Sequence, residues 1–166
     1  MALLLNEMVR AGVVVNYAVF GAVAQMRYTE SVATLDADIL IALPEPNRLN
    51  LLSSIYQFCR QHGYQPEGEA VTVGAWPVQF IPTLDRLTEA ALRDAETAEV
   101  DGVPLRVVTA DYLAAIALSV GRAKNFARVC ALLEAKATTP DAISRLCSEF
   151  GLTTAWDRFR TRFPDA

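Results

Sequence analysis

The chain has 166 residues, of which 52% are hydrophobic and 20% are charged, and its 15 basic and 19 acidic residues give a net charge of −4. This composition predicts one compact domain and excludes extended disorder. It also argues against a protein whose main task is to hold nucleic acid through its phosphates, because such proteins are basic.

The N-terminal part of the chain contains no segment that we expect to cross a membrane. Residues 2–11 have the spacing of a short amphipathic helix and include Glu7. The longest apolar run, residues 11–24, contains Asn16 and is shorter than the ~20 residues that a spanning helix needs. The three cysteines are widely spaced, which is typical of buried thiols in a reducing compartment. We therefore expect a cytoplasmic protein with no membrane partner.

The first half of the chain predicts strands and helices in alternation. Gly and Pro residues separate these elements, as they do at turns. We predict a buried strand over 13–20 that ends at Gly21, a helix over 22–28, a strand over 36–43 stopped by Pro44 and Pro46, a helix over 49–61 and a β-hairpin over 69–82 around Gly74.

The second half predicts mostly helices. A helix over 84–95 and a strand over 103–109, after the turn at Asp101-Gly102, precede a helical segment with breaks near Gly121, Pro140 and Gly151. We therefore predict an α/β (α+β) fold with two parts in one compact unit. Residues 1–108 form a mixed sheet of four to five strands flanked by helices, and residues 109–166 form a helical extension packed on this core.

Two acidic residues stand one residue apart at the start of an otherwise apolar strand. Because side chains alternate along a strand, Asp36 and Asp38 point to the same face, with their Cα atoms about 6.5–7 Å apart. Two carboxylates at this spacing can hold one divalent cation such as Mg²⁺. The alternative is an ordinary pair of solvated acids at the end of a strand.

The turn before this strand has its own chemistry. Gly21 ends one strand and opens a helix, whose free amides and dipole can hold an anion such as a triphosphate. The alternative is that Gly21 only permits close packing, since no GxGxxG or Walker lysine motif is present. A phosphate cradle and an acid pair, brought together, make the two halves of a nucleotide site.

These residues resemble the nucleotidyltransferase fold superfamily, the group related to DNA polymerase beta. The resemblance is strongest to minimal nucleotidyltransferases of bacteria and to toxins of the abortive-infection type IV class. Its first motif reads Phe20-Gly21-Ala22, then thirteen residues, then Asp36-Ala37-Asp38-Ile39. Thr34 also stands where the family often has threonine.

A second stretch, residues 100–135, resembles the family's strand and the helical segment that follows it. The matching residues are Leu113, Gly121, Arg122 and Lys124. The resemblance implies that Asp36 and Asp38 act as catalytic metal ligands for Mg²⁺. It also implies that Gly21, Ala22, Thr34, Arg122 and Lys124 bind the nucleotide.

The resemblance also has gaps. The family's third acid aligns with Gln79, and Asn125 and Arg128 replace common aspartates. A glutamine offers neither charge nor useful basicity, so we expect a degenerate active site with weakened catalysis. Asp85 could substitute for the missing acid, but it is more simply explained as the cap of the next helix.

Two functions follow as expectations. The first is transfer of a nucleotidyl group from a nucleoside triphosphate to a hydroxyl of a protein or RNA, with Mg²⁺ as cofactor. The second is an inactive member of the fold that binds a protein partner, as components of toxin–antitoxin systems do. The segment 156–163 alternates aromatic and basic residues, which leaves open whether it contacts single-stranded nucleic acid or packs its aromatic stripe against the sheet or a partner.

Overall fold

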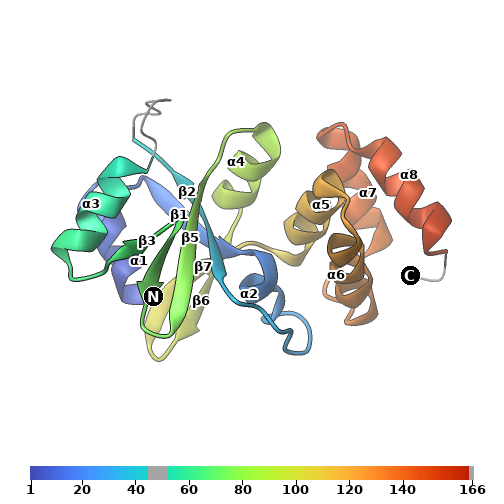
Figure 1. Ribbon diagram of the computed structural model, residues 1–166. Helices are drawn as coiled ribbons and strands as arrows, with labels where there is room; N and C mark the ends of the chain where they lie inside the picture. Colours follow the sequence, from blue (N-terminus) through green and yellow to red (C-terminus); the bar gives the residue numbers. More distant parts are fainter. Residues whose placement is uncertain (45–51, 165–166) are drawn as a thin grey trace.

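The computed structural model describes residues 1–44 and 52–164, and a seven-stranded mixed sheet forms its centre (Figure 1). In the order β3-β4-β5-β2-β1-β7-β6, β2 is parallel to β5 and β1 is parallel to β7, while the other neighbours are antiparallel. The strands are β1 (Asn16–Phe20), β2 (Ala37–Ala42), β3 (Pro66–Glu67), β4 (Ala70–Val73), β5 (Trp76–Pro82), β6 (Glu96–Val100) and β7 (Val103–Val107).

The four to five strands predicted from the sequence are too few. The predicted strands and the hairpin around Gly74 are present, but β3 and β6 were missed. β3 has only two residues, and β6 lies at the edge of the sheet, where each of its residues is exposed or half-buried. Neither strand needs an apolar face, so neither produces the alternation that identifies a strand in a sequence.

Eight helices complete the described chain. They are α1 (Ala2–Arg10), α2 (Gly21–Gln25), α3 (Ser53–Gln61), α4 (Arg86–Arg93), α5 (Ala110–Val120), α6 (Ala123–Glu134), α7 (Pro140–Glu149) and α8 (Thr153–Arg162). Each predicted helix is present, and the predicted breaks separate α5 to α8. The start of the predicted 49–61 helix, residues 49–51, and Pro46 lie outside the described residues.

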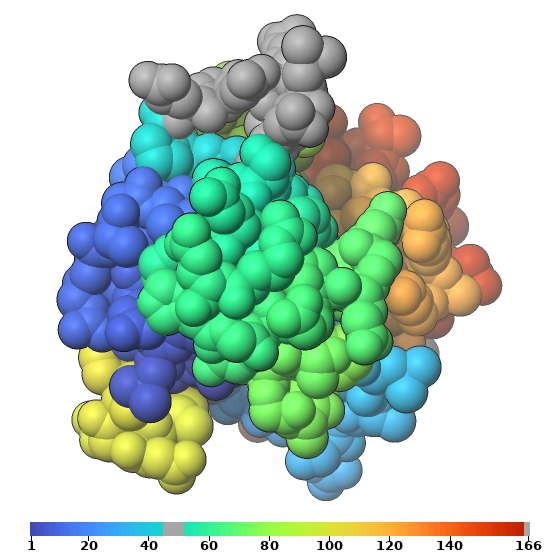
Figure 2. All heavy atoms as spheres, turned by 60° about the vertical axis from the view of Figure 1, so that its left-hand side comes forward, coloured from blue at the N-terminus to red at the C-terminus, as the bar shows by residue number. Residues whose placement is uncertain are grey.

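Helices cover both faces of the sheet. α1 contacts β1 and β7, and Figure 1 shows α1 and α3 on one side of the sheet with α2 and α4 on the other. In Figure 2, α3 and the β4–β5 hairpin form the middle of the face that is turned toward the viewer, and the last four helices lie behind them. The central strand β2 is therefore buried on both faces: Ile39 points to one side, Leu40 points to the other, and both are fully buried.

The last four helices pack beside the face that carries α2 and α4 (Figure 1). Trp156 and Phe159 of α8 are buried, and the guanidinium groups of Arg158 and Arg162 lie over the ring of Phe126 on α6. The aromatic stripe of the C-terminal segment thus packs on neighbouring helices of the described chain, mainly through Phe126 of α6, and not on the sheet as the sequence interpretation expected. That residues 109–166 are a part distinct from residues 1–108 stays a prediction.

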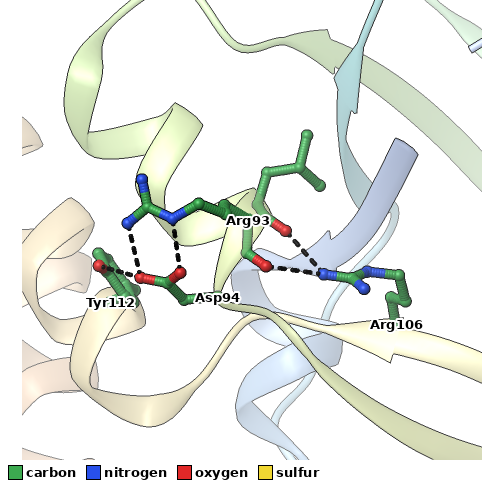
Figure 3. A network of polar contacts seen from close by, with 5 residues as sticks. Arg93, Asp94, Arg106 and Tyr112 are labelled. Atoms are coloured by element: carbon green, nitrogen blue, oxygen red, sulfur yellow. Dashed lines mark hydrogen bonds and ion pairs between the residues drawn. The ribbon is translucent and has the colours of Figure 1, made fainter. Parts of the chain in front are cut away.

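A polar network joins the end of α4 to the first turn of α5 (Figure 3). The Asp94 carboxylate accepts two hydrogen bonds from the Arg93 guanidinium, at 2.7 and 2.9 Å, and one from the Tyr112 hydroxyl at 2.7 Å. Arg106 of β7 donates from Nη2 to the carbonyl oxygens of Leu92 and Arg93 at the end of the same helix. These contacts fix α4 to the neighbouring strand and to the helical extension.

Among the described helices, none combines the length and the apolar character needed to cross a membrane.

Candidate functional site

The register of the sheet brings three sequence-distant positions into one row. On neighbouring strands β1, β2 and β5, Phe20 pairs with Asp38, and Asp38 pairs with Gln79. Gly21 follows Phe20 directly, so it lies at the end of this row. Asp38 points to the face of the sheet that carries α2, because the residues on either side of it, Ala37 and Ile39, pack on the opposite face.

Gly21 and Asp38 are in direct contact. Gly21 has φ +68°, in the left-handed region that favours glycine. A β-carbon built on residue 21 would lie 3.1 Å from Cγ and 3.2 Å from Cβ of Asp38, and it would collide with Oδ2. The turn and the acid therefore occupy one space, and a side chain at residue 21 would have to displace the carboxylate.

The second acid is held by two neighbours. The Oγ1 atom of Thr34 lies 3.1 Å from the backbone oxygen and 3.3 Å from Oδ1 of Asp36, and Nε2 of Gln79 donates to Oδ2 of Asp36 at 3.1 Å. Thr34, Asp36 and Gln79 are all half-buried. The sequence assigned Thr34 to the nucleotide, whereas the structure shows its hydroxyl on Asp36.

Opposing charges act on Asp38. Burial of the carboxyl raises its pKa, and so does the negative charge of Asp36, whereas the positive charges of Arg128 and Lys124 act in the opposite direction. The net effect is a raised pKa of Asp38, so the two cations do not fully offset the cost of burying its negative charge beside Asp36. The site therefore favours an added positive charge beside the two acids.

The predicted basic residues lie at the start of α6. Lys124, in the first turn, is close enough to act on the carboxyl of Asp38, and it is exposed. Arg122 is the N-cap residue of the same helix and is also exposed, but its charge is not among those that act on Asp38. The structure therefore brings Gly21 and Asp38 into contact beside Asp36, and the charge of Lys124 acts on Asp38.

Comparison with known structures identifies the fold. The crystal structure of an antigenic nucleotidyltransferase-like protein from Paracoccidioides brasiliensis superposes with a TM-score of 0.63 and 11% identity, over 99% of this chain and 87% of that one. The chain has a nucleotidyltransferase fold. ANT(2″)-Ia in complex with adenylyl-2″-tobramycin also matches, with a TM-score of 0.45 and 13% identity over 96% of this chain and 94% of that one. A second structure of ANT(2″)-Ia gives the same score at 12% identity, over 97% and 90% of the two chains.

The scores of 0.45 are too low to add to the argument, and identities this low concern the fold alone. No protein-family model and no curated protein matches the sequence.

Within this nucleotidyltransferase fold, Gln79 stands beside the acid pair, at the position the resemblance gave to the third acid. Asp85 does not replace it. Oδ1 of Asp85 accepts a hydrogen bond from the backbone amide of Thr88 at 2.8 Å, so Asp85 caps α4. Among the described residues, no cluster of three or more His, Cys, Asp or Glu side chains is arranged to hold a metal.

Sequence reasoning missed two residues on this face of the nucleotidyltransferase fold. Gln25, the last residue of α2, is only 5% exposed, and its Oε1 accepts a hydrogen bond from Nε of Arg128 on α6 at 3.0 Å. Arg128 was noticed only as a departure from the family pattern. A polar residue within the apolar helix 21–25 was the available signal for Gln25, but only its hydrogen bond to α6 in the folded chain identifies its partner.

One cavity adjoins this region, and a larger one lies apart from it. A cavity of about 390 Å³ is lined by Gln25, by residues 29–32 and by the end of α6, so it adjoins the Gln25–Arg128 pair. A larger cavity of about 650 Å³ lies between the start of α4 and the turn that joins α7 to α8. The residues of the acid pair are not part of its lining, so we do not assign it to the acid site.

Proposed function

We propose that this protein binds a magnesium–nucleoside triphosphate at Asp36, Asp38 and the turn at Gly21, and that it transfers the nucleotidyl group slowly to a hydroxyl of a protein or RNA. One observation carries this proposal: the carboxylate of Asp38 fills the space in front of Gly21 where a side chain would stand. An acid pair packed on a strand-to-helix turn, in a nucleotidyltransferase fold, is the arrangement that such chemistry needs.

The donor atoms suit one divalent cation. Asp36 and Asp38 offer half-buried carboxylates, which are the ligands that Mg²⁺ prefers. The raised pKa of Asp38, caused first by burial and then by the charge of Asp36, means that a cation between the two acids would relieve an existing repulsion. When bound, Mg²⁺ supplies charge neutralisation at the phosphate oxygens.

Gln79 limits the reaction. Its Nε2 donates to Asp36, so in this arrangement it orients a metal ligand and cannot accept a proton from an attacking hydroxyl. Loss of the group that activates a nucleophile typically costs about 10²–10⁴-fold in rate. We therefore expect nucleotide binding to be better preserved than transfer.

Thermal unfolding with and without ligand tests the binding half of the proposal. Mg²⁺ with a non-hydrolysable nucleoside triphosphate, at about 100 times its dissociation constant, should stabilise the protein by about 2.7 kcal/mol. Asp36→Ala should abolish this gain, whereas Asp141→Ala, which makes the same charge change in the first turn of α7, should retain it. No shift in the wild-type protein with any of the common triphosphates would refute the binding site.

Incorporation of label from nucleoside triphosphates into protein or RNA tests transfer. Label that appears slowly and is lost in Asp36→Ala supports the enzyme. The second candidate is a catalytically inactive partner-binding module, which is favoured by the uncharged Gln79 beside the acids. Ligand-induced stabilisation without any incorporation would select this second function.

A further inference from the structure

Arg128 occupies an unusual place for a guanidinium group. It lies on α6, half-buried, and its Nε donates to the buried carboxamide of Gln25 at 3.0 Å. Gln25 ends the short helix that Gly21 begins. The hydrogen bond therefore fixes the arginine to the same element that forms the turn in front of Asp38.

The rest of this guanidinium has no partner in the described part of the chain. Apart from the bond to Gln25, Arg128 makes no hydrogen bond there and no ion pair within 4 Å. Its charge nevertheless acts on the carboxyl of Asp38, and that of Asp38 acts on Arg128. The arginine thus acts electrostatically on Asp38 without forming an ion pair with it.

Arg128 is half-buried, so its guanidinium is partly withdrawn from water without a bonded anion to compensate its charge. Its Nη groups stay accessible to a ligand, because among the described residues only Nε of Arg106 is a buried side-chain polar atom without a partner. Burial lowers the pKa of Arg128, which reflects the cost of this withdrawal from water. Lys124 lies four residues earlier on α6, so both cations share one face of that helix. Both positive charges act on Asp38, which also feels the negative charge of Asp36, and a magnesium–phosphate group has the matching pattern of charge.

We infer that Gln25 and Arg128 form a phosphate-binding site for the nucleotide, in which Gln25 holds the guanidinium by Nε and leaves its two Nη groups free to donate to phosphate oxygens. The inference rests on the proposed function and adds the residues that recognise the phosphates. Arginine suits this task because its planar fork donates to two oxygens at once. Lys124 adds a second charge at the same face, and Asp36 and Asp38 are left to the metal.

The test compares Arg128→Met, Arg128→Lys and the control Arg60→Met. Arg60 is exposed on α3, which packs on the other side of the sheet, and its loss makes the same charge change (Figure 1). Calorimetry should measure four probes with each protein: Mg²⁺ alone, inorganic tripolyphosphate with Mg²⁺, adenosine, and a non-hydrolysable nucleoside triphosphate with Mg²⁺. Thermal unfolding of each variant checks that it is folded.

We expect Arg128→Met to weaken tripolyphosphate and triphosphate binding by about 10- to 100-fold, as for the loss of charge-assisted hydrogen bonds. Mg²⁺ alone should bind as well as before or more tightly, because a repelling cation has been removed. Adenosine binding should not change. Arg128→Lys should recover part of the phosphate affinity, and Arg60→Met should match the wild-type protein.

Opposite effects on Mg²⁺ and on tripolyphosphate would support the inference, because a purely structural role predicts the same direction for every probe. Equal losses for all four probes, or unchanged tripolyphosphate binding in a folded Arg128→Met variant, would overturn it while the proposed function stands. If the wild-type protein binds no triphosphate at all, both the proposed function and this inference fail.

Discussion

The side-chain amide of Gln79 donates to Oδ2 of Asp36 at 3.1 Å, although the two residues are 43 positions apart in the sequence. The parallel pairing of β2 with β5 creates this contact. An uncharged donor thus faces the acid pair from the neighbouring strand.

Gln79→Asp should make the site dependent on cations. Three carboxylates would then face one another, and two charges about 5 Å apart repel by about 3 kcal/mol at an effective dielectric constant of about 20. Without divalent cations we expect the free energy of unfolding to fall by about 1–3 kcal/mol, and Mg²⁺ should restore it. Transfer activity should rise, which label incorporation would measure.

Gln79→Met serves as the neutral control for that experiment. It removes the hydrogen bond to Asp36 without adding charge, so the free energy of unfolding should fall by about 0.5–1.5 kcal/mol. Mg²⁺ should not stabilise this variant more than it stabilises the wild-type protein. A Gln79→Asp variant that is equally stable with and without cations, and no faster in transfer, would contradict this account of the site.

Gly21→Ala should destabilise the protein more than an equivalent change elsewhere. Gly12 has nearly the same φ, +69°, but a β-carbon there would meet nothing within 4 Å. Gly12→Ala should therefore cost only the left-handed backbone strain, about 1–2 kcal/mol. Gly21→Ala adds the collision with Asp38, and we expect at least ~1 kcal/mol more.

A double-mutant cycle identifies the source of that difference. In an Asp38→Ala background, the collision with the carboxylate is gone and only the 3.2 Å approach to Cβ remains, so most of the extra cost of Gly21→Ala over Gly12→Ala should disappear. Urea unfolding of the four proteins measures this. If the extra cost persists without the carboxylate, then the contact between Gly21 and Asp38 is not its cause.

Tyr112 and Asp94 should show coupled effects on stability. Their hydrogen bond joins the first turn of α5 to the end of α4, and the pKa of Tyr112 is raised to about 12, mainly by burial and then by this bond. A cycle of Tyr112→Phe and Asp94→Ala should give a coupling energy of about 0.5–1.5 kcal/mol. Additive effects would mean that the bond does not stabilise the fold.

The ion pair between Arg93 and Asp94 should make the stability of the fold slightly sensitive to acid. The hydrogen bond from Arg93 holds the pKa of Asp94 below its usual range. The unfolded chain therefore takes up the proton first as pH falls, and the contribution of Asp94 is present above its unfolded pKa near 4 and lost below its folded pKa. In Asp94→Ala, unfolding measured from pH 6 to pH 2 should show a correspondingly shallower loss of stability.

Alkaline pH should destabilise the protein through two buried thiols. Burial raises the pKa values of Cys59 and Cys147 to about 11. As pH rises, the thiols of the unfolded chain ionise first, so this stabilisation is complete below about pH 9 and is lost by about pH 11. We expect a loss on the order of 1–2 kcal/mol per thiol, measured by urea unfolding at several pH values.

Cys59→Ala/Cys147→Ala should flatten the alkaline decline between pH 9 and pH 11. Cys130→Ala is the matched control: that thiol is only half-buried, and burial raises its pKa less than those of the other two, so its removal should flatten the decline less. An equal slope in the double variant and the wild-type protein would assign the decline to other groups, such as the tyrosines whose pKa values burial raises.

The sequence by itself determined the elements that bury apolar surface. The central strands β1 and β2, the hairpin of β4 and β5, and the four C-terminal helices follow from apolar periodicity and from glycines at the turns. This works because burial imposes a repeating pattern on such elements. β3 and β6 escaped prediction because edge strands carry no buried face of their own.

The sequence also singled out Gly21, Asp36, Asp38 and Gln79, but it could not establish their distances. Only the register of β1, β2 and β5 decided that Asp38 contacts Gly21 and that Gln79 bonds to Asp36. Only the tertiary arrangement that brings the end of α2 next to α6 decided that Arg128 meets Gln25. Such contacts join residues up to 103 positions apart, and local patterns contain no information about them, because they arise only when whole elements pack.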